Sequence, residues 1–486
     1  MSLAALSVLY LVTACMHAAR EKLWYDEVLT FDAATLLSSP GAFWAFLTRV
    51  EASPPLGFVL AAGSESIFGR NEFALRLPSV IAFWIMALCL YWFLSRRLPG
   101  VFAIAGMLLA VLTAAGRYSY EARPYAVMLA CAGVALVAWQ SAADGVRRRP
   151  ALFALGAALA GALCAHSMAV TLAVPFLAGE IARTIQRKRV DWPVWFAFAA
   201  ATPAVLVLWA IKSGRDFSAM SRFKGSVSHH IVTTYLQMLK PAAVPLALAL
   251  LVVLALRVRG TGETRRTWGL RTYELAALVG FALIPFAAVP FSTLSGNYFL
   301  RYSLNCTMGL AGLLAVLLFR IGGTNRQAGV VVMTIFAAVF TVGQFLPEDR
   351  RWDAGLKALN ASADIQASLE RMPDDAPIVL CRGTTLVELD HYSDPRLAAR
   401  LYYLTEPAVA AAIDGDILFE VGGSQLARYS PLRAHFEDYH AFIATHKRFY
   451  VVEPIRNIAR EYFAGRIGLQ YRETSNHFGY YEATVR

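Results

Sequence analysis

Two adjacent carboxylates, Asp26 and Glu27, stand among aromatic residues in the stretch "EKLWYDEVLTFD", residues 21–32. A carboxylate can take a proton from a hydroxyl group, so this pair is a candidate general base. Trp24 and Tyr25 precede the pair, and such aromatic residues favour the membrane–water interface. The alternative is a solvated acidic pair that begins an amphipathic helix, because acidic side chains favour helix N-termini.

A second acidic position lies in "RYSYEARPYAVML", where Glu121 and Arg123 come just before Pro124. Proline suits the first turn of a helix, so we predict that a membrane span begins there. The planar guanidinium of Arg123 matches phosphate oxygens, which makes this residue a candidate anion ligand. The alternative is a Glu–Arg pair that neutralises itself at the end of a span.

Three further stretches carry ionisable side chains beside apolar runs. His166 stands where two apolar runs meet, in "LCAHSMAV", and Arg301 and Tyr302 open another run in "SGNYFLRYSLN". Arg215 and Lys224 belong to a basic loop, residues 212–230, that ends at His229 and His230. We interpret this loop as a lid whose cations reach a phosphate. The alternatives are a structural histidine, an arginine that snorkels beside a tyrosine, and a loop that touches lipid headgroups.

The composition explains why such residues are informative. The chain has 486 residues, of which 57% are hydrophobic and only 16% are charged, whereas soluble domains are about 25% charged. The net charge of +11 comes from basic residues in short gaps between apolar runs, a membrane-topology signal that argues against nucleic acid as a partner. The six cysteines have no CxxC spacing, so we interpret them as small buried hydrophobic residues.

Hydropathy predicts a polytopic α-helical membrane protein. A span needs about 20 apolar residues, and we predict eleven: 2–19, 77–95, 98–116, 124–142, 150–164, 166–183, 192–211, 240–257, 272–291, 302–319 and 327–345. The run 55–68 is shorter and contains Ser64 and Glu65, so we expect it to be interfacial or re-entrant, like the other juxtamembrane helices of the first external loop, 20–76. With a cytoplasmic N-terminus, the arginine-rich gaps then fall inside, as the positive-inside rule requires.

Two domains follow from this topology: a transmembrane domain over 1–345 and a soluble extracytoplasmic α/β domain over 346–486. The second region is more charged. We predict strands at "APIVLCR", "DILFEV", "KRFYVVEP" and "HFGYYEATV". We predict amphipathic helices at "DAGLKALNASADIQASLERM" and "PLRAHFEDYHAFIATH".

The candidate residues therefore gather on the extracytoplasmic face. Ionisable side chains within or beside a membrane span cost free energy to bury, and they tend to be functional. The set suits the transfer of a group from an anionic, lipid-linked donor. It consists of two acidic sites, two arginines at span ends, a histidine and a basic loop. A carboxylate would remove the proton of the acceptor, and the cations would stabilise the charge that develops on the leaving phosphate.

Several of these stretches resemble the membrane glycosyltransferases of the C-type (GT-C) fold. They are "WYDEVLT", "SPPLGFVL", "FGRNEFALRLPSV", "YSYEARPYA", "HSMAV", "LRYSL" and "RRWDAGLKAL". Their order is similar to that of the branch containing protein O-mannosyltransferases, lipid A aminoarabinose transferases and bacterial galacturonosyltransferase-like relatives. The resemblance covers about residues 20–360. One departure is Ser53, where many relatives have a histidine before the two prolines.

The resemblance implies a function and a set of roles. The reaction is expected to be an inverting displacement from a polyprenyl-phosphate sugar to a lipid, glycan or protein acceptor. Asp26 would activate the acceptor hydroxyl with Glu27 in support, and Glu121 would lie near the donor or a metal. The residues expected to face the donor are Arg123, His166, Arg301 and Tyr302. The resemblance does not decide whether the protein binds a divalent metal, because some relatives bind one and others need none.

Two other functions use the same features differently. A transporter or flippase for a lipid-linked anion would use the same cations but would not need Asp26 as a base. A receptor would use the external domain and need the membrane part only as an anchor, for which eleven spans are excessive. The alanine-rich spans and the absence of an external disulfide framework favour a bacterial inner membrane.

Overall fold

The computed structural model describes most of the chain as two compact units. The described residues are 3–213, 226–259, 268–293, 298–322, 326–345, 365–372, 374–413, 418–452, 456–473 and 478–486. Unit 1 consists of Met1–Glu21, Ser53–Lys212 and Phe223–Leu346, and unit 2 consists of Lys22–Ala52, Ser213–Arg222 and Pro347–Arg486. The first external loop is thus divided, and its first part belongs to the same compact unit as the C-terminal residues.

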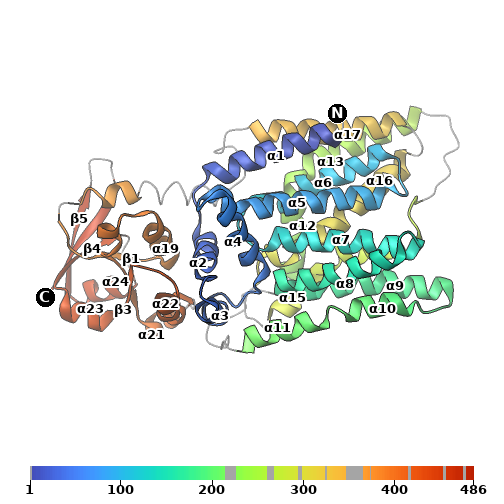
Figure 1. The fold of residues 1–486 in the computed structure, drawn as a ribbon. Coiled ribbons are helices and arrows are strands. Elements are labelled where there is room, and N and C mark those ends of the chain that lie inside the picture. The colour runs from blue at the N-terminus through green and yellow to red at the C-terminus, as the bar shows by residue number, and fades with distance from the viewer. Residues whose placement is uncertain are drawn as a thin grey trace. The chain divides into compact units, whose positions relative to one another are not determined.

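Unit 1 is a bundle of helices that run side by side (Figure 1). The longer helices are α1 (Leu3–Arg20), α4 (Leu56–Phe68), α5 (Glu72–Ser95), α6 (Gly100–Leu112), α7 (Tyr125–Asp144), α8 (Arg148–Ala165), α9 (Ala173–Arg187), α10 (Trp192–Ala199), α11 (Thr202–Ser213), α12 (Val227–Leu239), α13 (Ala243–Arg259), α14 (Thr272–Ala282), α15 (Ile284–Thr293), α16 (Cys306–Gly322) and α17 (Arg326–Phe345). Short 3₁₀ turns connect some of them: η2 (Ala114–Ser119), η3 (Ser167–Leu172), η4 (Lys240–Ala242) and η5 (Leu300–Ser303).

These helices agree with the predicted spans. Within the described residues, eight segments are long and apolar enough to cross a membrane: Leu3–Arg20, Glu72–Ser95, Tyr125–Asp144, Arg148–Ala165, Ser167–Arg187, Trp192–Ser213, Val227–Leu256 and Thr272–Ser292. The other three predicted spans correspond to shorter apolar helices, Gly100–Leu112, Cys306–Gly322 and Gln327–Gly343. The run predicted to be too short for a span is α4, of 13 residues. A polytopic helical membrane protein is therefore confirmed.

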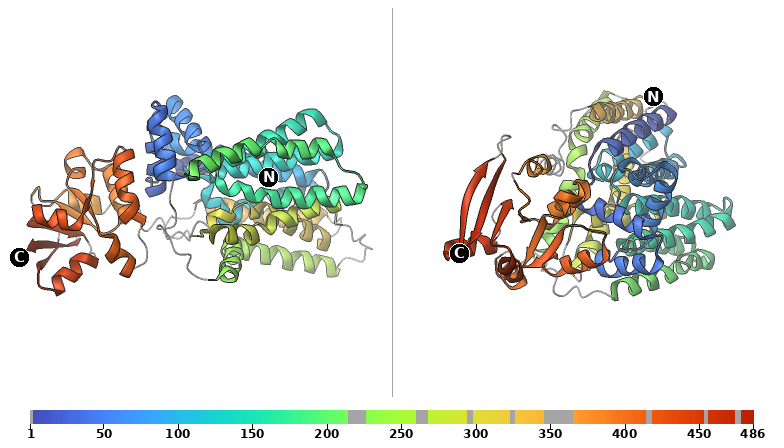
Figure 2. Two further views of the ribbon diagram at one scale, coloured as in Figure 1. Left: turned by 90° about the horizontal axis from the view of Figure 1, so that it is seen from below. Right: turned by 60° about the vertical axis from the view of Figure 1, so that its left-hand side comes forward.

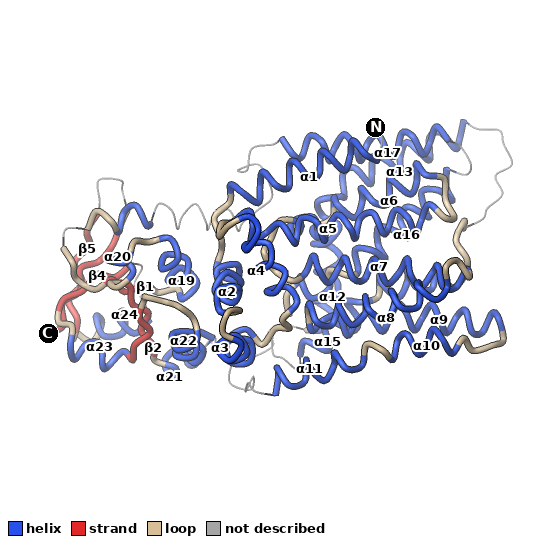
Figure 3. Tube along the Cα trace, in the orientation of Figure 1, coloured by secondary structure: helices blue, strands red, loops and turns tan. Residues whose placement is uncertain are grey.

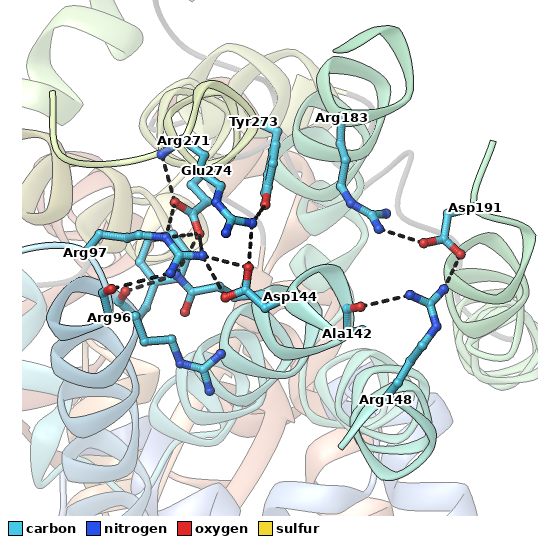
Figure 4. Close-up of polar contacts among 12 residues, drawn as sticks. Arg96, Arg97, Ala142, Asp144, Arg148, Arg183, Asp191, Arg271, Tyr273 and Glu274 are labelled. Atoms are coloured by element: carbon cyan, nitrogen blue, oxygen red, sulfur yellow. Dashed lines mark hydrogen bonds and ion pairs between the residues drawn. The ribbon is translucent and has the colours of Figure 1, made fainter. Parts of the chain in front are cut away.

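One end of unit 1 is held together by ion pairs that are buried or partly buried. We call it the basic end; there α5, α7 and α9 end and α8, α10 and α14 begin. Arg97 donates from Nε to both carboxylate oxygens of Glu274 at 3.1 Å and from Nη2 to Asp144 at 2.6 and 2.7 Å (Figure 4). Glu274, which is 0% exposed, also accepts from Gln140 and from the backbone N–H of Arg271, both at 2.9 Å. One carboxylate thus ties α5 and α7 to the beginning of α14.

A second group of ion pairs lies beside the first and joins α8, α9 and α10. Asp191 accepts from Arg183 at 2.7 Å and also pairs with Arg148 (Figure 4). Glu180 accepts from the same Arg183 at 2.7 Å and from the indole of Trp139 at 3.0 Å. Arginines that we interpreted only as a topology signal therefore also form specific contacts between helices.

Unit 2 contains every strand of the described chain, in a six-stranded sheet of order β3-β2-β1-β4-β6-β5 (Figure 2, Figure 3). The strands are β1 (Ile378–Leu380), β2 (Leu401–Thr405), β3 (His435–Asp438), β4 (Arg448–Val452), β5 (Ile467–Glu473) and β6 (Gly479–Val485). The first four strands of this order are parallel, and β6 and β5 continue the sheet in antiparallel pairing. A parallel sheet is normally covered on both faces, and β1 is buried along its whole length.

Helices supply that cover. They are α19 (Gly383–Tyr392), α20 (Pro395–Ala398), α21 (Pro407–Ile413), α22 (Leu418–Tyr429), α23 (Tyr439–Thr445) and α24 (Arg456–Phe463). Ile378 of β1 points into a core cluster with Leu386 of α19, whereas Val379 points into another with Phe442 of α23. This alternation confirms the predicted α/β fold.

Two element predictions in this region are wrong. The described part of the predicted strand "DILFEV", residues 418–421, is the start of α22, and residues 416–417 lie outside the described residues. Phe419, Gly423 and Leu426 follow the spacing of one helix face, and Gly423 lies against the Phe436 ring. The predicted helix "PLRAHFEDYHAFIATH" is divided, because its first part, His435–Asp438, pairs with β2 before α23 begins. The helix predicted at "DAGLKALNASADIQASLERM" lies mostly outside the described residues.

Unit 2 also contains two helices of the first external loop, α2 (Tyr25–Leu36) and α3 (Pro40–Phe46), followed by a π-helical turn, η1 (Leu47–Glu51). In addition α2 contacts α19, and both α3 and η1 contact α22. The helix that carries the acidic pair therefore packs on the helices that cover the sheet.

Removal of the Glu274 carboxylate should destabilise unit 1 strongly. In Glu274→Ala, the half-buried Arg97 keeps only one of its two carboxylates and the buried amide of Gln140 loses an acceptor. We expect the free energy of unfolding, measured by denaturation in mixed micelles, to fall by about 3–5 kcal/mol. The control is Asp375→Asn, which breaks an exposed pair with Arg396 and should cost less than about 1 kcal/mol. Equal effects of the two variants would contradict a structural role for the buried pairs.

Candidate functional site

The acidic pair lies in the first turn of α2, and its two carboxylates have different surroundings. Glu27 is 1% exposed and its Oε2 accepts from the backbone N–H of Trp24 at 3.4 Å. Glu27 therefore caps the N-terminus of its own helix, as the glutamate of a capping box does. Asp26 is 8% exposed, and its negative charge is favoured beside the positive end of the helix dipole. Both carboxylates are thus more buried than the solvated alternative requires.

The second acidic segment lies in unit 1, just before α7. Glu121 and Arg123 are both buried, and the backbone N–H of Arg123 donates to the carbonyl of Glu121 at 2.7 Å. The carbonyl of Arg123 in turn accepts from the hydroxyl of Ser79 on α5 at 3.3 Å. These backbone bonds hold the segment in a tight turn that leads into Pro124, the N-cap of α7.

The proline-rich stretch before α4 also has a structural explanation. The Cα of Gly57 lies so close to the 121–124 segment that an added Cβ would be 2.9 Å from Cβ of Pro124 and 3.3 Å from its Cα. Glycine is needed at such close approaches because it has no Cβ. The "PPLGF" sequence therefore allows α4 to contact the segment that carries Glu121 and Arg123.

His166 lies between α8 and η3, where the two spans meet. Its Nδ1 accepts from the backbone N–H of Met168 at 3.1 Å, so the neutral ring carries its proton on Nε2. Burial lowers the pKa of His166 well below its ordinary value, and the positive charges of Arg123, Lys212 and Arg301 lower it further. A neutral imidazole with a fixed Nε2–H donor is thus placed near three cations.

The residues around η5 complete this cluster. The guanidinium of Arg301 lies 4.4 Å from the Phe299 ring centre and 6.0 Å from that of Tyr125. The ring of Tyr302 lies 6.0 Å from the ring of His166, which in turn lies 5.0 Å from Tyr125. We call this set the His166 cluster, and its members are Arg123, Tyr125, His166, Lys212, Arg301 and Tyr302.

The structure thus brings together four predicted residues, Arg123, His166, Arg301 and Tyr302. Arg215 and Lys224, predicted in the basic loop, lie outside the described residues. The ends of that loop are helical rather than free: Lys212 is in the last turn of α11, and His229 and His230 are in α12. The prediction of a loop up to His230 is wrong at this end, because Ser226 caps α12 by accepting from the N–H of His229.

Two tyrosines of this region were not among the predicted site residues. Tyr125 opens α7 and contacts both His166 and Arg301. The Tyr298 hydroxyl bonds to Thr234 of α12 at 2.7 Å and donates to Ser303 at 2.8 Å. The signal in the sequence was a tyrosine near the arginine of each motif, in "RPYA" and "NYFLRY", since tyrosine joins a large apolar ring to a polar hydroxyl and is enriched at interfaces.

The described residues contain no group of three histidine, cysteine, aspartate or glutamate side chains that could hold a metal ion. The cations of the His166 cluster are groups that can compensate the charge of a phosphate.

Comparison with known proteins identifies the fold. The model of the dolichyl-phosphate-mannose-protein mannosyltransferase family matches residues 52–211, which include α4, the Glu121 segment and His166. The apo crystal structure of ArnT from Cupriavidus metallidurans matches with a TM-score of 0.60 at 14% identity, over 99% of this chain and 97% of that chain. The structure of ArnT bound to undecaprenyl phosphate matches with a TM-score of 0.58 at 14% identity, over 99% and 98%. No curated protein sequence matches the chain.

The chain is therefore a multi-pass membrane protein with the GT-C fold, as its sequence motifs predicted. The family match, which covers roughly a third of the 486 residues, is to a glycosyltransferase family. Both findings agree with the class of protein that the motifs resemble.

The close approach of Gly57 to Pro124 can be tested directly. Gly57→Ala should force α4 or the 121–124 segment to move, and we expect a loss of about 1–3 kcal/mol in the free energy of unfolding. The matched control is Gly63→Ala on the same helix, where nothing lies within 4 Å of the added Cβ. That change should stabilise α4 by about 0.5–1 kcal/mol. A Gly57→Ala protein as stable as Gly63→Ala would contradict the close contact.

Proposed function

We propose that the chain is an inverting glycosyltransferase that moves a monosaccharide from a polyprenyl-phosphate donor to an extracytoplasmic lipid, glycan or protein. The observation that carries the proposal is the His166 cluster, where the buried His166 ring lies beside the rings of Tyr125 and Tyr302 and the guanidinium of Arg301 lies over Tyr125. The positive charges of Arg123 and Lys212 also act on this imidazole. A lipid phosphate is an anion whose tail stays in the bilayer, so it reaches this end of the unit from the membrane. The binding of undecaprenyl phosphate by ArnT, which has the same fold, supports this donor class.

The donor phosphate is held by charge-assisted hydrogen bonds. Arg123 and Arg301 supply planar guanidinium groups that match phosphate oxygens. His166 adds a neutral Nε2–H donor, which binds an oxygen without taking up a proton. Tyr302 faces the sugar beside the imidazole. In the transition state, negative charge accumulates on the departing phosphate, and fixed cations stabilise it more than they stabilise the bound donor.

The acceptor is activated by Asp26. The acceptor oxygen attacks the anomeric carbon from the face opposite the phosphate, and the carbon–oxygen bond to the phosphate breaks as the new glycosidic bond forms. The acceptor proton passes to the Asp26 carboxylate, and polyprenyl phosphate leaves with the bonding electron pair. Glu27 supports Asp26 by capping the helix that carries it, and Glu121 is the second acidic residue, on the donor side.

Two further assignments belong to the same proposal. Arg215 and Lys224 act as donor-binding cations of the basic loop. The orientation follows from the positive-inside rule, with a cytoplasmic N-terminus in a bacterial inner membrane and the reaction on the other side.

Replacement of the base should abolish turnover without loss of donor binding. In Asp26→Asn, we expect the rate of transfer or hydrolysis of a radiolabelled polyprenyl-phosphate sugar to fall by about 10²–10⁴-fold, because the amide cannot take the acceptor proton. Asp375→Asn, which removes a carboxylate from the surface of unit 2, is the control and should keep wild-type activity. Wild-type turnover by Asp26→Asn would refute the assignment of the base. Movement of the lipid across vesicles, with no transfer from any sugar donor, would favour a flippase.

Replacement of Arg301 should weaken phosphate binding selectively. In Arg301→Gln, we expect the dissociation constant for polyprenyl phosphate to rise about tenfold to a hundredfold, because a charge-assisted hydrogen bond is lost. The affinity for neutral polyprenol should not change. The control is Arg320→Gln in the last turn of α16, where the guanidinium stacks on Trp268 at 3.7 Å. Equal losses for the phosphate and the alcohol would show that Arg301 does not bind the phosphate.

A further inference from the structure

The N-terminus of α2 is held by side chains from a distant part of the chain. The backbone N–H of Leu23 donates to the hydroxyl of Tyr392 at 2.6 Å, and that of Tyr25 donates to Oε1 of Glu388 at 2.9 Å. Between them, the N–H of Trp24 donates to Glu27. The first N–H groups of a helix have no partner within the helix. Here three consecutive amides at the entry to α2 bind side chains, two of which belong to α19.

Aromatic contacts fix the same helix along its length. The Tyr25 ring meets the Phe419 ring of α22 edge to face at 5.3 Å, and the Phe31 ring meets the His391 ring of α19 at 4.8 Å. Such pairs contribute about 0.5–1.5 kcal/mol each beyond the area that they bury. The ring contacts therefore restrict rotation of α2 about its axis as well as its distance from α19.

A third type of contact holds α2 two turns further on. The hydroxyl of Ser430, which follows α22, forms a hydrogen bond with the carboxylate of Asp32. Both residues are buried. Because bonds are present at the entry to α2 and again at Asp32, the helix is attached at two separate points and cannot pivot about one of them.

We propose that Glu388 and Tyr392 are positioning residues for Asp26, so that the C-terminal domain sets the place and direction of the catalytic carboxylate. This inference rests on the proposed function, in which Asp26 is the base. Asp26 directly follows Tyr25, whose amide is held by Glu388, so the backbone of Asp26 is set by that bond. General-base catalysis depends strongly on geometry, and an error of about 1 Å can cost roughly a hundredfold in rate.

Another residue of α19 provides a matched control. Oδ1 of Asp390 accepts from the backbone N–H groups of Arg433 and Ala434 at 3.0 and 2.8 Å. These contacts lie within the C-terminal domain, and among the described residues Asp390 forms no hydrogen bond or ion pair with α2. Asp390→Asn, which removes the negative charge that pairs with Arg433, should therefore weaken the domain without releasing the entry to α2.

The first experiment separates the hydrogen-bond acceptor from the charge at position 388. Burial raises the pKa of Glu388 to about 7, although the bond from the Tyr25 amide opposes this shift. Glu388→Gln keeps a carbonyl acceptor of the same length, so it should keep the wild-type kcat. Glu388→Leu removes the acceptor, and Tyr392→Phe removes only a hydroxyl. We expect kcat in these two variants of the full-length protein to fall about tenfold to a hundredfold, with an unchanged KM for a polyprenyl-phosphate sugar.

The second measurement is hydrogen exchange of residues 22–28, which reports the bonds at Leu23 and Tyr25 without any assay of activity. Exchange should be faster in Glu388→Leu and Tyr392→Phe than in the wild type, Glu388→Gln and Asp390→Asn. Unchanged exchange and kcat in Glu388→Leu and Tyr392→Phe would overturn the inference. An equal loss of kcat in Asp390→Asn would also overturn the inference, because it would indicate general damage to the domain. If Asp26→Asn is active, the proposed function fails, and exchange alone decides whether α19 holds α2.

Discussion

The cost of burying charge is the constraint on which the helical unit depends. A buried ion loses several kcal/mol of hydration, which only close partners and hydrogen bonds offset. At the basic end, Glu274, Asp144 and Asp191 lie within direct bonding distance of arginines, so the charges neutralise one another and join helices. At the other end, the same cost keeps His166 neutral beside its cations. The first arrangement stabilises a fold, whereas the second suits an anion that arrives and leaves.

The same reasoning applies to uncharged groups at the entry to α2. The N–H groups that lead into a helix and its first turn need acceptors, and for Leu23 and Tyr25 these acceptors come from residues 369 and 363 positions away in the chain. This arrangement joins two parts of the sequence that no local signal connects. It also assigns a task to the C-terminal domain that does not require the domain to bind a substrate itself.

The sequence predicts the membrane part well because a bilayer imposes a simple rule, a long apolar run for every crossing. It predicts α4 as a short helix because Ser64 and Glu65 interrupt the apolar run. In the C-terminal domain, the apolar run at Phe419 has the length of a strand, and only the packing of Gly423, four residues further along the same helix face, against Phe436 reveals the spacing of a helix. Strand β3 was missed because His435–Asp438 is polar and half-exposed, and its pairing with β2 is not visible locally.

The candidate site also contains residues that the sequence reveals and residues that only the structure reveals. Arg123, His166, Arg301 and Tyr302 each belong to a motif that can be found in the sequence, and the structure adds that they meet. Glu388 and Tyr392 belong to no motif, since their importance arises only from the place where α19 meets α2.

Asp26 and Glu27 are adjacent on α2, so their carboxylates cannot have the same role. Successive side chains are separated by about 100° around the helix axis, so Asp26 and Glu27 face different directions. Glu27 has the longer side chain, and it turns back to the Trp24 amide, which a glutamate at the third helical position can reach. Asp26, at the second position, is one methylene shorter and follows directly the amide that Glu388 holds. Exchange of the two residues would place the shorter acid at the capping position and the longer one at the base position, and both functions would lose their geometry. The order Asp–Glu, rather than the presence of two acids, is therefore the feature of this stretch that the proposed chemistry requires.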